Sequence, residues 1–180
     1  MKNKKTLIAV IIVAALLFAA VGTTVVAYMF RRTDEKKNTF IPAVVSCEVN
    51  ETTNRPLTEK SEIIIKNTGN IDAYLRLRIV SYWMDSNGNI LPKPSVIPTF
   101  TAASGWVSGS GNTYYYSSPI EPGASTPNLL AEGSTITLSE EDGALQVVEI
   151  ISEAIQSKPE SAVTDSWKVT VSDGKITHAN

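Results

Sequence analysis

The chain has 180 residues, with 16 basic and 18 acidic side chains, one histidine and one cysteine. This length suits one domain with a hydrophobic core of its own. A single histidine excludes a zinc site on a histidine pair, and because that histidine, His178, lies near the end of the sequence, we expect neither a Ser-His-Asp triad nor a Cys-His pair. The single cysteine, Cys47, excludes an internal disulfide. The mildly acidic balance also argues against nucleic acid as a partner.

Residues 1–27 predict an export segment. Basic MKNKK is followed by a stretch without charge from Thr6 to Phe30, which is long enough to span a bilayer as an apolar helix. Small residues before Tyr28 favour cleavage between Ala27 and Tyr28 by a signal peptidase, and we prefer this interpretation to a retained membrane anchor. On either interpretation the chain is exported, and it meets the membrane only through this segment.

Residues 28–38 predict a charged arm or linker. From Arg31 to Asn38 the sequence reads RRTDEKKN, with no apolar period. Such a stretch is either a solvated spacer or an arm that becomes ordered on meeting a partner. The folded domain is expected to follow, over residues 39–180.

Short strands separated by turns are expected in that domain. Thr39–Val49 predicts a peripheral first strand, because Pro42 suits an edge or the start of a strand. The clearest strand is Ala73–Tyr82, where side chains alternate with a period of two, so that one face meets the core and the other meets solvent or a loop. The other expected strands are residues 62–66, 105–108, 113–117, 134–138, 145–151 and 167–171.

Two segments have competing interpretations. Asp85–Asn89 contains the Asn-Gly pair of tight hairpins, and we prefer a turn to a calcium loop because Val96 stands where that loop needs a glutamate. Val147–Ile155 could form a helix, but its β-branched residues favour a strand. About eight short strands predict an all-β fold of two packed antiparallel sheets, a β-sandwich that follows an N-terminal apolar helix.

No group of residues predicts an active site. The densest acidic cluster, Glu140-Glu141-Asp142, precedes a glycine and is typical of a solvated turn. Gly109 and Gly111 lie among serines, with no following helix to hold a phosphate group. We therefore expect no enzyme activity, no cofactor and no metal site.

Trp106 and three adjacent tyrosines could form a binding patch for a sugar or a base, or they could pack in the core. Alternation places Tyr115 on the face opposite Tyr114 and Tyr116, so the three tyrosines cannot form a continuous platform. We prefer packing, and the alternative is an aromatic patch of Trp106, Tyr114 and Tyr116.

Four stretches together resemble the TasA and camelysin family, exported proteins of Gram-positive bacteria that are processed by the signal peptidase SipW. They are AYMF at 27–30 with Asn38-Thr39-Phe40 after it, KNTGNIDAYLRLRI at 66–79, YYYSSPIEPGASTPNLL at 114–130, and EAIQS at 153–157 with Trp167. One departure is Pro42-Ala43, where relatives commonly place a glycine.

The resemblance implies a jelly-roll β-sandwich and a structural role in extracellular fibres or biofilm matrix, in the medium or at the cell surface. Some camelysin relatives are described as metalloproteases, but the missing histidine pair argues against transferring that activity.

We expect assembly by strand donation, in which the N-terminal arm adds to an exposed sheet edge of the next subunit. Tyr28 and Phe30 would fill apolar pockets, and Asn38, Thr39 and Phe40 would lead into the domain. Such a head-to-tail contact propagates as a filament of this chain or with related matrix proteins. The alternative is a monomeric or membrane-anchored adhesin that binds its ligand near Trp106.

Overall fold

The computed structural model describes residues 41–53 and 58–179. The predicted export segment, the cleavage site between Ala27 and Tyr28, and the arm with Tyr28 and Phe30 lie outside the described residues, as do Asn38, Thr39 and Phe40. From Pro42 onward the described residues belong to one compact unit. In this described part, no helix is long and apolar enough to cross a membrane.

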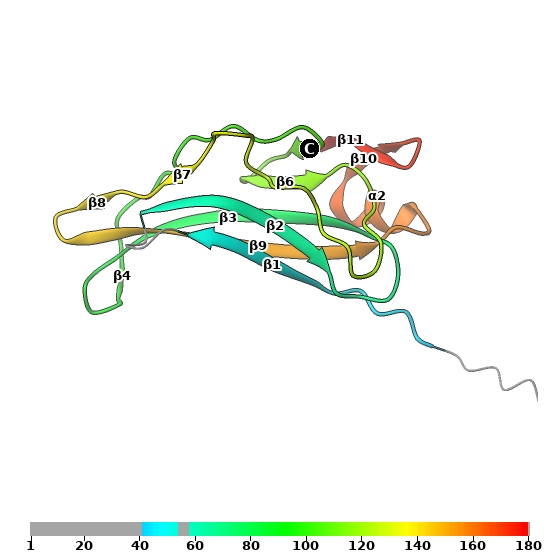
Figure 1. The fold of residues 1–180 in the computed structure, drawn as a ribbon, viewed down its shortest axis with the longest axis horizontal. Coiled ribbons are helices and arrows are strands. Elements are labelled where there is room, and N and C mark those ends of the chain that lie inside the picture. Colours follow the sequence, from blue (N-terminus) through cyan, green and yellow to red (C-terminus); the bar gives the residue numbers. More distant parts are fainter. Residues whose placement is uncertain (1–40, 54–57, 180) are drawn as a thin grey trace, which may run out of the picture. The chain divides into compact units, whose positions relative to one another are not determined.

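Antiparallel sheets make up nearly all of the regular secondary structure in the described residues, which confirms the all-β class (Figure 1). One sheet has the strand order β1-β2-β7, a larger one has the order β5-β6-β3-β9-β8 with β4 beside β3, and β10 pairs with β11. The strands are β1 Cys47–Thr53, β2 Glu59–Asn67, β3 Ala73–Met84, β4 Ile90–Leu91, β5 Trp106–Ser108, β6 Thr113–Tyr116, β7 Ile136–Thr137, β8 Glu140–Glu141, β9 Ala144–Gln156, β10 Val169–Ser172 and β11 Lys175–Ala179.

The long antiparallel pair of β3 and β9 is the centre of the larger sheet. It runs without a break from Ala73 opposite Gln156 to Met84 opposite Leu145. The predicted alternation along β3 is confirmed, because its odd-numbered apolar residues are buried against β2 and the segment that precedes β7. Two sheets that share one core in this way are consistent with a β-sandwich. The main members of that core are Ile63, Ile65, Leu75, Leu77, Ile79, Leu129, Leu130, Ile136 and Val148.

A smaller cluster covers one end of the other face of β3. The helix α2, Ser161–Trp167, lies there with β10 and β11, and Tyr74 and Tyr115 are buried against them. The Arg76 guanidinium lies 4.6 Å from the centroid of the Trp167 ring and pairs with Glu153 at 2.5 Å. Beyond this cluster the outer face of β3 and β9 is open, and Ile151 is 46% exposed.

The predicted first strand, Thr39–Val49, is wrong in its bounds. The strand begins only at Cys47, and residues 42–46 are instead held by the turn that follows β2. The backbone N–H groups of Thr68 and Asn70 donate to Ser46 O and Val44 O, both at 3.0 Å. The backbone approaches so closely that a Cβ on Gly69 would lie 2.3 Å from Val44 O. Only glycine therefore fits at this turn.

The C-terminal region also differs from the prediction. A strand was expected over residues 167–171, but Trp167 ends α2 and the strand β10 starts at Val169. Val163 and Trp167, four residues apart, form the buried face of that helix. The final strand β11 was not predicted.

Other expectations are confirmed. Val147–Ile155 lies in strand β9, so the helical alternative is wrong. Asp85–Asn89 is a hydrogen-bonded turn, in which Asp85 N donates to Asn89 O at 3.0 Å. The Asn89 side chain, and the backbone N–H groups of Asn89 and Asn87, donate to the Asp85 carboxylate and hold its pKa below its usual range. The hairpin of β5 and β6 also forms as expected.

Asn67 gives a direct test of this architecture. Its side chain is fully buried, donates to Ile71 O at 2.9 Å and Ile120 O at 2.8 Å, and accepts from Gly69 N at 2.9 Å. Asn67→Ala is expected to lower the free energy of unfolding by about 2–3 kcal/mol, because buried backbone groups lose their partners. Asn50→Ala, on the exposed side of β1, is the control and should change it by less than about 0.5 kcal/mol. Equal effects in chemical denaturation would contradict this role of Asn67.

Candidate functional site

The outer edge of β9 is the longest unpaired strand edge in the larger sheet. On one side β9 pairs with β3 along almost its whole length. On the other side, among the residues that the structure describes, it pairs only with the short strand β8, at Leu145 and Ala144. Figure 1 shows β8 at one end of β9, and β1 running beside β9 without pairing to it. We call the stretch Val148–Ala154 on this side the β9 edge.

Strand geometry identifies which backbone groups the β9 edge presents. In an antiparallel ladder, alternate residues direct their N–H and C=O groups to the same side. Gln146 N donates outward, to Ser139 O at 2.8 Å. The backbone groups of the next four even-numbered residues therefore also point outward, and none of them is paired with a strand in residues 41–53 or 58–179. These residues are Val148, Ile150, Ser152 and Ala154.

The hydrophobic core is only partly covered along this edge. Ile150 and Ala154 of β9 and Cys47 of β1 pack against the core but are not fully buried. The Cys47 thiol donates to Ser152 Oγ at 3.3 Å. Burial raises the pKa of this thiol, and the nearby Glu153 raises it further, while the Ser152 contact partly offsets both. The thiol therefore stays protonated and forms part of the seam between β1 and β9.

The edge of β2, unlike the edge of β9, is covered by another part of the described chain. Beyond β7, the outward N–H groups of β2 are met by a loop: Ile63 N donates to Asn128 Oδ1 at 2.9 Å, and Ile65 N donates to Thr126 Oγ1 at 3.0 Å. Asn67 N donates to Ala124 O at 2.9 Å. The described chain thus closes the edge of β2 with residues 124–129 and leaves the edge of β9 without such a cover.

An apolar pocket of about 170 Å³ opens at the start of the β9 edge. Here the chain passes from β7, which pairs with β2, to β8, which pairs with β9, and Leu138 N in this crossing donates to Thr58 O at 2.7 Å. The pocket lies in the space that this crossing leaves beside β9. Its apolar wall consists of Met84, Leu138, Leu145, Val147 and Val148, and Thr53, Glu59, Lys60 and Gln146 complete it.

The charged residues of β9 and β1 are all acidic. Strand β9 contains Glu149 and Glu153 and no basic residue, and β1 contains Glu48 and Glu51 and no basic residue. Two of these carboxylates are paired, Glu153 with Arg76 and Glu51 with Lys60. The edge is therefore suited to an extended segment that carries basic side chains.

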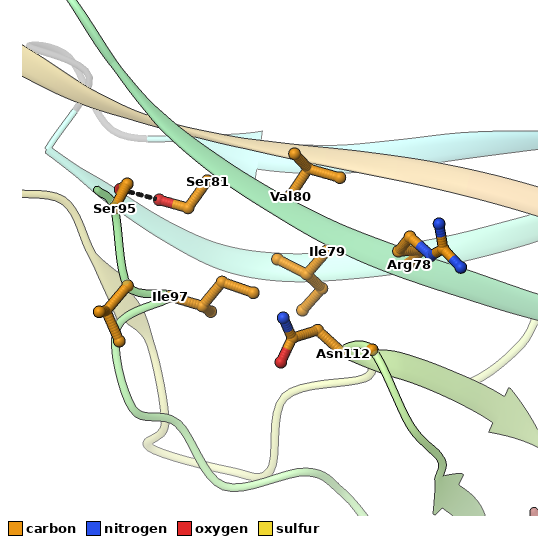
Figure 2. Close-up of a pocket in the computed structure, with 9 residues that line it drawn as sticks. Arg78, Ile79, Val80, Ser81, Ser95, Ile97 and Asn112 are labelled. Atoms are coloured by element: carbon orange, nitrogen blue, oxygen red, sulfur yellow. Dashed lines mark hydrogen bonds between the residues drawn. The ribbon is translucent and has the colours of Figure 1, made fainter. Parts of the chain in front are cut away.

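A second cavity, of about 590 Å³, lies at the opposite edge of β3 (Figure 2). The side chains of Ile79, Ile97 and Asn112 converge on it, and Ser81 Oγ contacts Ser95 Oγ at 2.6 Å. This gap is short, because β6 pairs with β3 up to Arg78 and β4 pairs from Trp83. This gap is therefore too short for a further strand to pair along it.

The residues of the alternative aromatic patch pack against the core, Trp106 as a buried residue and Tyr114 and Tyr116 as partly buried ones. Trp106 is 9% exposed, and its indole N–H donates to Asn128 O at 3.2 Å. Its ring meets Tyr116 edge-on, with centroids 5.5 Å apart, while Tyr114 lies 5.4 Å from Phe100. Tyr115 is on the other face, in the cluster with Trp167, as alternation predicts. These rings serve packing, and they do not form an exposed platform.

The acidic cluster is divided between a strand and a turn. Glu140 and Glu141 form the exposed strand β8, and Asp142 is in the turn to β9 with a positive φ of 53°. Glu141 pairs with Lys93 at 2.6 Å. Within the ranges that the structure describes, no group of three or more His, Cys, Asp or Glu side chains is placed to hold a metal ion.

Comparisons with protein-family models, with curated proteins and with solved structures find no match to this chain.

Sequence reasoning missed the β9 edge. It predicted strand character for residues 145–151 but not the length of β9, its partner β3 or the absence of a partner on its other side. The run Val147–Ile155, rich in β-branched residues, indicates a strand, but the absence of a partner on one side of that strand leaves no local signal in the sequence.

Hydrogen exchange tests whether the edge is open. In the unassembled chain, the N–H groups of Val147, Glu149, Ile151 and Glu153 donate toward β3 and should exchange more slowly than those of the even-numbered residues between them, by at least about 10-fold. NMR exchange rates along β9 would show a period of two. Uniform protection would contradict an open edge.

Proposed function

We propose that this chain is an exported structural subunit of extracellular fibres or biofilm matrix. In this proposal the N-terminal segment directs export and is cleaved before Tyr28, and the sandwich has the jelly-roll connectivity that the family resemblance implies. The residues after the cleavage site form an arm that adds as a strand to the next subunit.

The observation that carries this proposal is the bare β9 edge. An unpaired edge beside a partly open core is a template for another strand, which would gain backbone hydrogen bonds and cover apolar surface at once. Proteins normally protect such edges with charge, bulges or a covering loop, as this one does along β2. An edge left open in an exported chain favours a partner that arrives after folding.

The arm suits that edge in length and charge. Residues 28–38 span eleven positions, whereas Val148–Ala154 spans seven, so the arm is long enough to pair along all of it. The arm has four basic residues, Arg31, Arg32, Lys36 and Lys37, and two acidic ones, Asp34 and Glu35. Its net positive charge complements the acidic residues of β9 and β1. Donation from one subunit to the next does not close and therefore propagates.

The adhesin alternative has less support. It depends on an aromatic surface around Trp106, and that side chain is buried and hydrogen-bonded within the domain. Among the described residues, the exposed large hydrophobic side chains include no aromatic ring. We therefore place the function in assembly and propose no catalytic activity.

A pair of substitutions in the arm tests assembly. Proline cannot donate a backbone hydrogen bond, and adjacent prolines at Arg32 and Thr33 remove a donor on each side of an added strand. Arg32→Pro with Thr33→Pro should raise the concentration needed for filaments about 10-fold or more, since about 1.4 kcal/mol corresponds to a factor of ten. Sedimentation and electron microscopy of the chain recovered from culture medium would measure this.

The matched control is Arg32→Ala with Thr33→Ala, which changes the same side chains but keeps both N–H groups. It loses only the charge of Arg32 and should assemble at a clearly lower concentration than the proline variant. Equal assembly by the proline and alanine variants would contradict strand donation, as would an unchanged chain that starts at Tyr28 and remains a stable monomer.

A further inference from the structure

We infer that the apolar pocket at the start of the β9 edge receives the Phe30 side chain of a second copy of this chain, and that this contact sets the register of the added strand. The inference rests on the proposed function. It adds which side chain anchors the arm on β9 and in which direction the arm runs, neither of which backbone hydrogen bonds alone would determine.

The position of the pocket is the first reason. Backbone pairing is indifferent to sequence, so an added strand could slide along β9 by two residues at little cost. The pocket lies where β8 ends, at Leu145 to Val148, so it would hold only one position of an incoming strand. A buried anchor at one end of an edge converts non-specific pairing into a single register.

The chemistry of the pocket is the second reason. Its apolar wall, which includes Met84, Leu138 and Leu145, suits a side chain without a polar atom, while the polar side chains of Lys60 and Gln146 in its lining already have partners within the domain. The arm offers Tyr28, Met29 and Phe30 as its apolar side chains. Burial of Tyr28 would require a partner for its hydroxyl group, whereas Phe30 has no such requirement.

Chain direction is the third reason. With Phe30 beside Val148, the basic residues Arg31 and Arg32 follow directly along the strand that carries Glu149 and Glu153. Asn38 then lies toward Gln156, because the eight steps from 30 to 38 match the eight from 148 to 156. The added strand therefore runs parallel to β9. The opposite direction would place the charged end of the arm at the apolar pocket.

The test uses the Arg32→Pro, Thr33→Pro chain as the acceptor, at a concentration below the one at which it assembles, because its own arm pairs weakly while its domain is unchanged. A fluorescent peptide of residues 28–38 is titrated against it, and anisotropy reports binding. Phe30→Ala in the peptide should weaken binding about 10-fold or more, while Tyr28→Ala should change it by less than about threefold.

Leu138→Trp in the acceptor fills the pocket, and together with Phe30→Ala in the peptide it forms a double-mutant cycle. Leu138→Trp should weaken binding of the unchanged peptide by a similar factor. Phe30→Ala in the peptide should then cause no further loss of affinity, because the pocket that binds the Phe30 ring is already filled. Met84→Trp fills the pocket from another wall and replaces Leu138→Trp if that variant does not fold.

Three outcomes overturn these claims differently. A peptide that binds well but is insensitive to Phe30 and to both tryptophan variants overturns the anchor and leaves strand donation standing. Weakening by Tyr28→Ala in place of Phe30→Ala overturns the assigned register. A peptide that does not bind at all overturns both the anchor and the proposed mode of assembly.

Discussion

The hydrogen-bond ladder between β3 and β9 is the interaction on which the rest of the structure depends. It positions the buried face of β3 over β2 and fixes which backbone groups of β9 are satisfied internally. Because a strand directs alternate residues to opposite sides, pairing on the β3 side leaves the groups of the other residues directed outward. The open edge is thus a direct consequence of the same ladder that organises the core.

The protein treats its two sheets differently at their edges. Residues 124–129 cover β2 with backbone, hydroxyl and amide acceptors, and the half-buried Asn128 side chain also donates to Ser61 O. Side chains that pair with the backbone of an edge strand must each be positioned precisely, since every buried polar group requires a hydrogen-bond partner. Their presence along β2 shows that the fold can close an edge, and the bare edge of β9 is therefore the more informative one. Under our proposal, the cover for β9 comes from another subunit.

Several parts of this architecture could be predicted from local sequence. The alternation of Ala73–Tyr82 reports a strand with one buried face, and the Asn-Gly pair at 87–88 reports a tight turn, because both signals depend on neighbouring residues alone. The bounds of the first strand could not be predicted. Residues 42–46 have strand-like composition, yet the turn at Gly69 captures their backbone groups in a contact between distant parts of the chain.

The helix α2 and the β9 edge were the features least visible in the sequence. The helix α2 has only two buried positions, which give no periodic signal in a seven-residue segment. The β9 edge and its pocket result from the register of β3 against β9 and from the crossing at Leu138, which are tertiary properties. Trp106 illustrates the reverse case, because an aromatic cluster in sequence can report packing as readily as recognition.

Contact between the arm of one subunit and β9 of another is the central claim of this account. Solid-state NMR on filaments grown from a mixture of ¹³C-labelled and ¹⁵N-labelled chains measures that contact between subunits alone. We predict cross-peaks between arm carbons of residues 30–36 and the amide nitrogens of Val148, Ile150, Ser152 and Ala154. Filaments that lack these cross-peaks, or that place the arm at another strand edge, would contradict it.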